Sequence, residues 1–207
     1  SVFFYTPVSG VEVARAKDAD TEATMARSLA YKGEKTVTDL TDFYNASNVI
    51  QDLGALTGET YYYGSVKGEE IADYSYNYST KKATPTTYAD SVAKTTSVFY
   101  YNDLRADDGA TSEDAMTKSE SYKTTDIDDI EKTAVTGIDV DGNGILDPGD
   151  TAAVIPNLQS ETFFQGGKGD EISDYSYNYQ VGTLTKKSTS VFFYTPVSGV
   201  EVARAKD

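Results

Sequence analysis

Short strand-like runs of apolar and aromatic residues, bounded by polar and turn-forming residues, recur along the chain and predict β-strands. The first two runs are residues 2–6 and residues 11–15. They flank Pro7-Val8-Ser9-Gly10, a loop made mostly of turn-forming residues. This arrangement predicts a β-hairpin with a four-residue loop at the start of the chain.

Two further hairpins are predicted, one at residues 61–63 and 71–78 and its partner at residues 163–164 and 172–179. Successive side chains of a strand point to opposite faces of a sheet. In Tyr74-Ser75-Tyr76-Asn77-Tyr78 this places three rings on one face and Ser and Asn on the other. We expect the rings to pack onto neighbouring hairpins; the alternative is a sugar-binding aromatic platform.

Helical spacing is present in two places. Residues 18–30 carry acidic residues followed by Ala, Met, Arg and Leu, and residues 41–56 space their Val, Ile and Leu side chains at helical intervals. The sequence therefore predicts two short helices between the first and second hairpins.

The first and last segments of the chain are identical in sequence. Residues 1–18 (SVFFYTPVSGVEVARAKD) recur unchanged as residues 190–207, which gives a period of 189 residues by subtraction, 190 − 1. Segments that evolve separately do not stay identical over such a length, so we expect a tandem array in the parent protein. Residues 190–207 are then the start of the next repeat.

A second, more diverged periodicity divides the period into half-repeats at residues 1–96 and residues 97–189. Strand-like segments recur between the halves while their spacing drifts, as loop insertions between fixed structural units produce. The matched segments are residues 1–5 with 97–101, 25–32 with 116–123, and 67–78 with 168–179, at offsets of 96, 91 and 101.

Composition favours an extended, folded protein. Only 39% of the residues are hydrophobic, yet 12% are aromatic, including 17 Tyr, which is too many for a disordered chain. The net charge of −15 and the absence of a basic run argue against nucleic-acid partners, because Lys and Arg supply that affinity. Acidic repeats in series repel one another unless cations screen or bridge them.

The absence of Cys and His removes thiol nucleophiles, thiolate and imidazole metal sites and the usual general base. Acidic pairs such as Glu69-Glu70 and Asp170-Glu171 could act as acid and base, but their duplicated position favours a structural turn. We therefore expect no enzymatic activity. No apolar run approaches the ~20 residues of a membrane span, so no direct membrane span is expected.

One motif carries definite chemistry, the segment DVDGNGILDPGD at residues 139–150. It places oxygen side chains at positions 1, 3, 5, 9 and 12 and Gly at position 6. This spacing resembles EF-hand and dockerin calcium loops. The resemblance implies a structural Ca²⁺ site whose ligands are Asp139, Asp141, Asn143, Ile145 through its carbonyl, Asp147 and Asp150. The alternative is a hydrated acidic turn.

Two weaker resemblances concern the hairpins. Tyr175-Ser176-Tyr177-Asn178 followed by Gly182-Thr183-Leu184 resembles the Tyr-rich hairpins of YD-repeat (Rhs-like) proteins, which coil into β shells. The repeated Asp-Tyr-Ser-Tyr-Asn-Tyr and Val-Phe-Phe-Tyr segments resemble giant tandem-repeat surface proteins of bacteria.

Together these features predict an all-β or β-dominated fold, an elongated tandem β-hairpin or solenoid-like repeat with short helical or loop insertions. The expected function is a structural repeat of a long extracellular filament, surface fibre or sheath that calcium stiffens. Its partners would be neighbouring copies of the same repeat, at the cell surface or outside the cell. The alternatives are an adhesin or ligand-binding stalk with Tyr-rich faces, and part of an Rhs-like shell.

Overall fold

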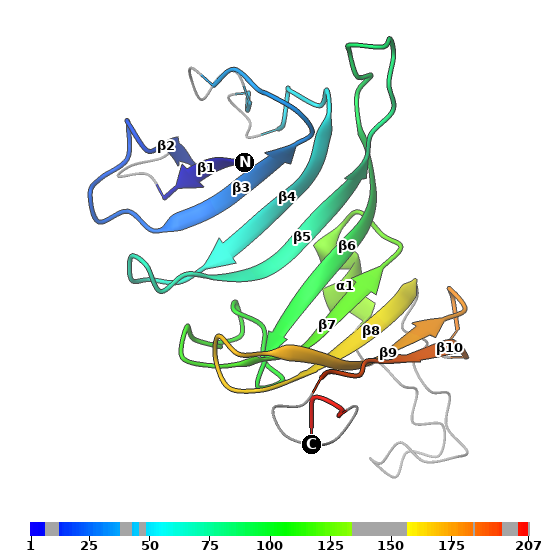
Figure 1. The fold of residues 1–207 in the computed structure, drawn as a ribbon. Coiled ribbons are helices and arrows are strands. Elements are labelled where there is room, and N and C mark those ends of the chain that lie inside the picture. Colours follow the sequence, from blue (N-terminus) through cyan, green and yellow to red (C-terminus); the bar gives the residue numbers. More distant parts are fainter. Residues whose placement is uncertain are drawn as a thin grey trace, which may run out of the picture.

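The computed structural model describes residues 1–6, 13–37, 43–45, 49–133, 157–183, 185–195 and 203–206. These residues form one antiparallel sheet of 10 strands, in which β3 to β10 follow chain order and β1 lies between β2 and β3 (Figure 1). The strands are β1 (Val2–Tyr5), β2 (Ala14–Arg15), β3 (Met25–Tyr31), β4 (Leu56–Tyr63), β5 (Ile71–Ser79), β6 (Val92–Tyr101), β7 (Met116–Tyr122), β8 (Leu158–Gln165), β9 (Ile172–Tyr179) and β10 (Lys186–Val191). One short helix, α1 (Ile127–Thr133), follows β7.

The all-β prediction is confirmed, and so is the strand pairing of the three hairpins: β1 pairs with β2, β4 with β5 and β8 with β9. The four-residue loop predicted for the first hairpin is wrong, because Tyr5 pairs with Ala14, which leaves residues 6–13 between the paired strands. The connection between β1 and β2 includes residues 7–12, which lie outside the described residues. The sheet is open, with β2 and β10 at its two ends (Figure 1). The finer expectation, an elongated solenoid-like repeat, stays a prediction.

The two predicted helices are wrong where the structure describes them. Residues 25–31 form β3, and Leu29 is fully buried between its neighbours β1 and β4. Pairing on both sides and burial of one face outweigh the modest helix propensity of this segment. The described part of residues 41–56 holds isolated β-bridges and the start of β4. The helix α1 was not predicted.

Strand pairings recur in the same register along the sheet. The pair β1 and β3 has the register of β6 and β7, and the pair β4 and β5 has the register of β8 and β9. The matched partners are Phe3–Ser28 with Phe99–Ser119, and Thr60–Ser75 with Thr162–Ser176. In each matched pair of strands the register shifts at the corresponding position, for example at Tyr61/Tyr62 and at Phe163/Phe164.

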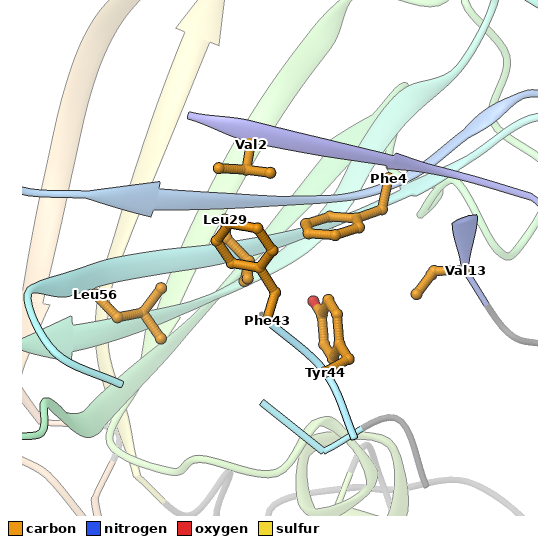
Figure 2. Close-up of a cluster of buried hydrophobic side chains, with 7 residues drawn as sticks. All are labelled: Val2, Phe4, Val13, Leu29, Phe43, Tyr44 and Leu56. Atoms are coloured by element: carbon orange, nitrogen blue, oxygen red, sulfur yellow. The ribbon is translucent and has the colours of Figure 1, made fainter. Parts of the chain in front are cut away.

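A first core covers one face of the sheet near its N-terminal end. Phe4 is fully buried against Phe43 and Tyr44, whose ring centroids lie 5.8 and 5.0 Å from its own. Phe43 and Tyr44 come from the connection between β3 and β4 and face the strands, as Figure 2 shows. The whole cluster comprises Val2, Phe4, Val13, Leu29, Phe43, Tyr44 and Leu56.

A second core lies further along the sheet, where α1 takes the place of the Phe43–Tyr44 segment. Ile127 and Ile130 of the helix pack on Val98 of β6 and Leu158 of β8. Asp126 caps the helix, since its Oδ1 accepts a hydrogen bond of 3.0 Å from the Asp128 amide. The two segments that cover the sheet, Phe43–Tyr44 and α1, follow β3 and β7, which have matching registers in the sheet. The same face is therefore buried by different insertions.

The predicted alternation of the Tyr-rich strands is confirmed. In β5, Tyr74 stacks on Tyr61 of β4 at 4.4 Å between ring centroids, and Tyr76 meets Tyr74 edge-on at 5.4 Å. On the other face, Ser75 Oγ lies 2.8 Å from Thr60 Oγ1. The rings contact one another in rows along one face, while hydroxyl groups pair across strands on the other.

Candidate functional site

Two buried aspartates of the Tyr-rich strands each form an ion pair with an arginine. Asp73 of β5 is 4% exposed and accepts hydrogen bonds from Arg105 Nε at 3.2 Å and Nη2 at 2.6 Å. Asp174 of β9 is 1% exposed and accepts the same two bonds from Arg204, at 2.9 and 2.5 Å. A two-pronged arginine–carboxylate pair fixes orientation as well as supplying attraction.

Each arginine is positioned by a short bridge that follows a strand. Tyr101 bridges to Leu104 directly before Arg105, and Tyr194 bridges to Ala203 directly before Arg204. The bridge folds the chain back over the end of β6 or β10, so the guanidinium reaches the aspartate on the neighbouring strand. These ion pairs hold one strand of each Tyr-rich hairpin to the strand beside it.

Sequence reasoning missed these pairs, although a signal was available. The aspartate directly precedes Tyr-Ser-Tyr-Asn-Tyr at both places where this run occurs, and an Arg-Ala dipeptide follows each Val-Phe-(Phe/Tyr)-Tyr segment. An acid retained on one side and a base retained on the other indicate a contact between the two segments.

A second pair of carboxylates ties hairpin tips to neighbouring strands. Glu70 accepts hydrogen bonds from the Gly68 amide at 2.9 Å and the Met25 amide at 2.8 Å. Glu171 accepts the equivalent bonds from the amides of Gly169 and Met116. The acidic pairs that could have served as acid and base are therefore placed in turns, where Glu70 and Glu171 bind backbone amides.

Carboxylates also lie among the tyrosines on the covered face. Glu59 is 3% exposed and accepts a hydrogen bond of 3.0 Å from the Tyr44 hydroxyl. Burial raises the pKa of Glu59, and the hydrogen bond from Tyr44 and the charge of Arg27 only partly offset that effect. The Arg27 guanidinium lies 4.6 Å from the centre of the Tyr61 ring.

In the matching region of β7 and β8, the pKa of a buried carboxylate shifts in the opposite direction. Glu120 lies directly opposite Glu161 on the neighbouring strand, and each accepts a hydrogen bond from a tyrosine hydroxyl, of Tyr122 and Tyr179 respectively. Burial acts to raise the pKa of Glu120, but hydrogen bonds from Lys118, 2.8 Å away, and from Tyr122 outweigh burial and lower it. The arrangement stabilises the charge of Glu120 within the sheet.

The buried tyrosines make stability sensitive to alkaline pH. Burial raises the pKa of Tyr78 and of Tyr101 to about 12, and it raises the pKa of Tyr61 and Tyr122 further. Because the folded pKa exceeds the unfolded value of ~10, this contribution to stability is complete below pH ~10 and is lost as the pH rises through the folded values.

We expect tyrosinate absorbance and loss of β circular dichroism to rise together between pH ~10 and pH ~12. Free tyrosine serves as the control for the unshifted titration. A complete tyrosine titration near pH ~10, with the β signal unchanged, would contradict the described burial of the rings.

The predicted calcium ligands Asp139, Asp141, Asn143, Ile145, Asp147 and Asp150 lie outside the described residues. They belong to the connection between α1 and β8. In the part of the chain that the structure describes, no three acidic residues gather as a metal site would require. No described helix has the length and apolar character needed to cross a membrane.

No family model matches the chain, and no curated protein and no solved structure matches it either.

Proposed function

We propose that the chain is a structural β repeat of a long extracellular filament, surface fibre or sheath. One observation carries the proposal: the identical segments 1–18 and 190–207 both contribute residues to a strand near an end of the sheet. Ser1 and Val2 begin one copy beside β3, and Ser190 and Val191 of β10 begin the other beside β9. A sheet that closes a period with the strand that opened it can be continued by another period.

The recurring register supports this continuation. In sheet order, β1, β3, β4 and β5 have the same relations to one another as β6, β7, β8 and β9, and β10 takes the place of β1 and β6 beside β9. Each strand type therefore has a defined partner on either side. Nearest-neighbour contacts of this kind let a repeat array extend without changing its parts.

Mechanically, the backbone ladder would carry load between strands, and buried ion pairs would resist sliding. Asp73 with Arg105 and Asp174 with Arg204 join strands that meet where one matched set gives way to the next. The Tyr rings of β5 and β9 are half-buried or buried in contact with other rings. That burial favours packing over an exposed adhesive strip, so a structural role is preferred to an adhesin.

Calcium is proposed to stiffen one point in each period, through the loop at residues 139–150. With Ca²⁺ at about 100 times its Kd, binding to the folded state alone adds ~2.7 kcal/mol to the free energy of unfolding. A chelator should remove this stabilisation, and Asp139→Ala should remove the response to chelator. Thermal unfolding with and without Ca²⁺ measures both. Equal melting in all conditions would sink the calcium proposal, while Asp20→Ala serves as an acidic control outside the loop.

The structural role is tested by chains of one, two and three periods of 189 residues. Small-angle scattering gives their maximum dimension. Because the sheet grows perpendicular to its strands, dimension should grow in proportion to the number of periods.

A further inference from the structure

Three arginines occupy equivalent positions in the sheet. Arg105 and Arg204 follow the bridges of Tyr101 with Leu104 and of Tyr194 with Ala203. Arg15 follows the same bridge near the N-terminus, where Tyr5 pairs with Ala14. Arg15 and Arg204 also occupy the same place in the identical segments 1–18 and 190–207.

At two of the three positions the arginine faces an aspartate from the neighbouring Tyr-rich strand. The contact at each of these positions has a second part, a tyrosine hydroxyl that donates to the carbonyl of the residue before the aspartate. Tyr101 donates to Ala72 at 3.0 Å, and Tyr194 donates to Ser173 at 2.6 Å. At these two positions, therefore, the arginine and the tyrosine together bind the carboxylate and a backbone carbonyl of one neighbouring strand.

At the third position no aspartate is present among the described residues. Nε and Nη1 of Arg15 are buried and have no hydrogen-bond partner there, although its guanidinium lies 5.7 Å from the ring centres of Phe4 and Phe43. Buried donor nitrogens without an acceptor are costly, so Nε and Nη1 of this half-buried side chain would gain from binding a carboxylate. In Arg105 and Arg204, Nε is one of the two donors to aspartate.

The strand edge beside Arg15 is also incomplete. Val2 pairs with Leu29 of β3 on one side, while β2 begins to pair only at Phe4. The residues equivalent to Val2 do lie opposite a Tyr-rich strand: Val98 lies opposite Tyr74, and Val191 lies opposite Tyr175. Among the described residues the outer edge at Ser1 to Phe3 carries no strand.

We propose that this edge and Arg15 form a docking socket for the segment Ile172–Tyr179 of a second copy of this sequence. The strand adds antiparallel to β1, with the Asp174 of that copy accepting both prongs of Arg15 and its Ser173 carbonyl accepting the Tyr5 hydroxyl. The proposal rests on the proposed structural function and specifies the contact through which one period joins the next.

The occupant follows from the identity of segments 1–18 and 190–207. Because β9 already accepts Ser190 and Val191, it can accept Ser1 and Val2 of another copy in the same register. Replacement of residues 190–207 on β9 by the identical residues 1–18 of another copy links copies head to tail, and a head-to-tail contact extends into an open array unless its rotation closes a ring.

The test uses the full chain, uniformly labelled with ¹⁵N, and an unlabelled synthetic peptide of residues 168–179 (KGDEISDYSYNY). We expect saturable shifts of the Arg15 Nε–Hε resonance and of the Val2 to Tyr5 amides. A matched peptide with Asn at the position of Asp174 should bind about tenfold more weakly or worse, because it lacks the charged, two-pronged acceptor.

On the protein side, Arg15→Lys should weaken binding of the aspartate peptide, since an ammonium lacks the planar fork. The control is Arg204→Lys, which alters a socket that Asp174 already fills and should leave peptide affinity unchanged. The Asn peptide does not alter the protein, so the comparison of peptides stands even where a variant folds poorly.

Three outcomes would overturn the socket. They are equal affinity for the two peptides, shifts confined to β10, and no shift at β1 at peptide concentrations up to ~1 mM, where even weak strand addition is detectable. Each leaves the structural proposal to its own test, the dimension of multi-period chains. If the multi-period chains fail that test while the protein still binds the aspartate peptide selectively, the socket stands and the filament proposal is rejected.

Discussion

Replacing Asp73 by Ala is expected to lower the free energy of unfolding by about 3–5 kcal/mol, because it leaves a buried charge without its carboxylate. Arg105, the partner, is 8% exposed and its Nη2 lies 2.6 Å from Asp73 Oδ2. Removing one member of a buried pair is more damaging than replacing both, since the remaining ion keeps its desolvation cost. Urea unfolding of the variant measures the loss.

The chain supplies a matched control for this prediction. Asp174→Ala removes the equivalent carboxylate, but the side chain of Arg204 is 30% exposed and can turn toward water. The free energy of unfolding should therefore fall less for Asp174→Ala than for Asp73→Ala. The double variant Asp73→Ala/Arg105→Met should recover part of the stability. A loss below about 1 kcal/mol for Asp73→Ala would place the pair in the class of surface ion pairs and contradict its described burial.

The second large effect is expected from Phe4→Ala, about 3–5 kcal/mol, because a fully buried ring is removed from the first core. Phe193 occupies the same position in the identical segment and is 60% exposed. Phe193→Ala should change stability by no more than about 0.5 kcal/mol. The two variants differ in environment and share their local sequence.

Thermal or urea unfolding of both variants gives the comparison. Similar losses at Phe4 and Phe193 would mean that the two rings are equally covered, which contradicts the burial of Phe4 and the exposure of Phe193. Phe193→Ala should become destabilising once a further period follows, since residues equivalent to Phe43 and Tyr44 would then cover the ring.

The hairpins were predictable because their signals are local. Alternating Tyr with Ser or Asn sets two faces, and Gly marks the tight turns between strands. At Gly166, φ is +125° and a Cβ would lie 2.4 Å from the Asp170 carbonyl oxygen, so that turn requires glycine. The predicted and the observed structures agree where a residue and its immediate neighbours determine the backbone conformation.

Long-range pairing explains what was missed. The segment 25–30 has a composition that a helix tolerates, and its strand conformation comes from β1 and β4 on either side. Residues 124–133 carried a weak helix signal, Asp126 followed by two acids and two isoleucines spaced three apart, which a short segment hides easily. The partners of Asp73 and Asp174 lie about thirty residues away and follow from topology.

The central claim is that the sheet continues from one period to the next, and the maximum dimension of one-, two- and three-period chains in solution tests it most directly. Eight strands, β1 and β3 to β9, make up a period. At ~4.8 Å between neighbours, each added period should lengthen the particle by up to roughly 40 Å. Particles that instead grow as compact globules, with a radius of gyration that rises roughly as chain length to the power ~0.38, would contradict the account.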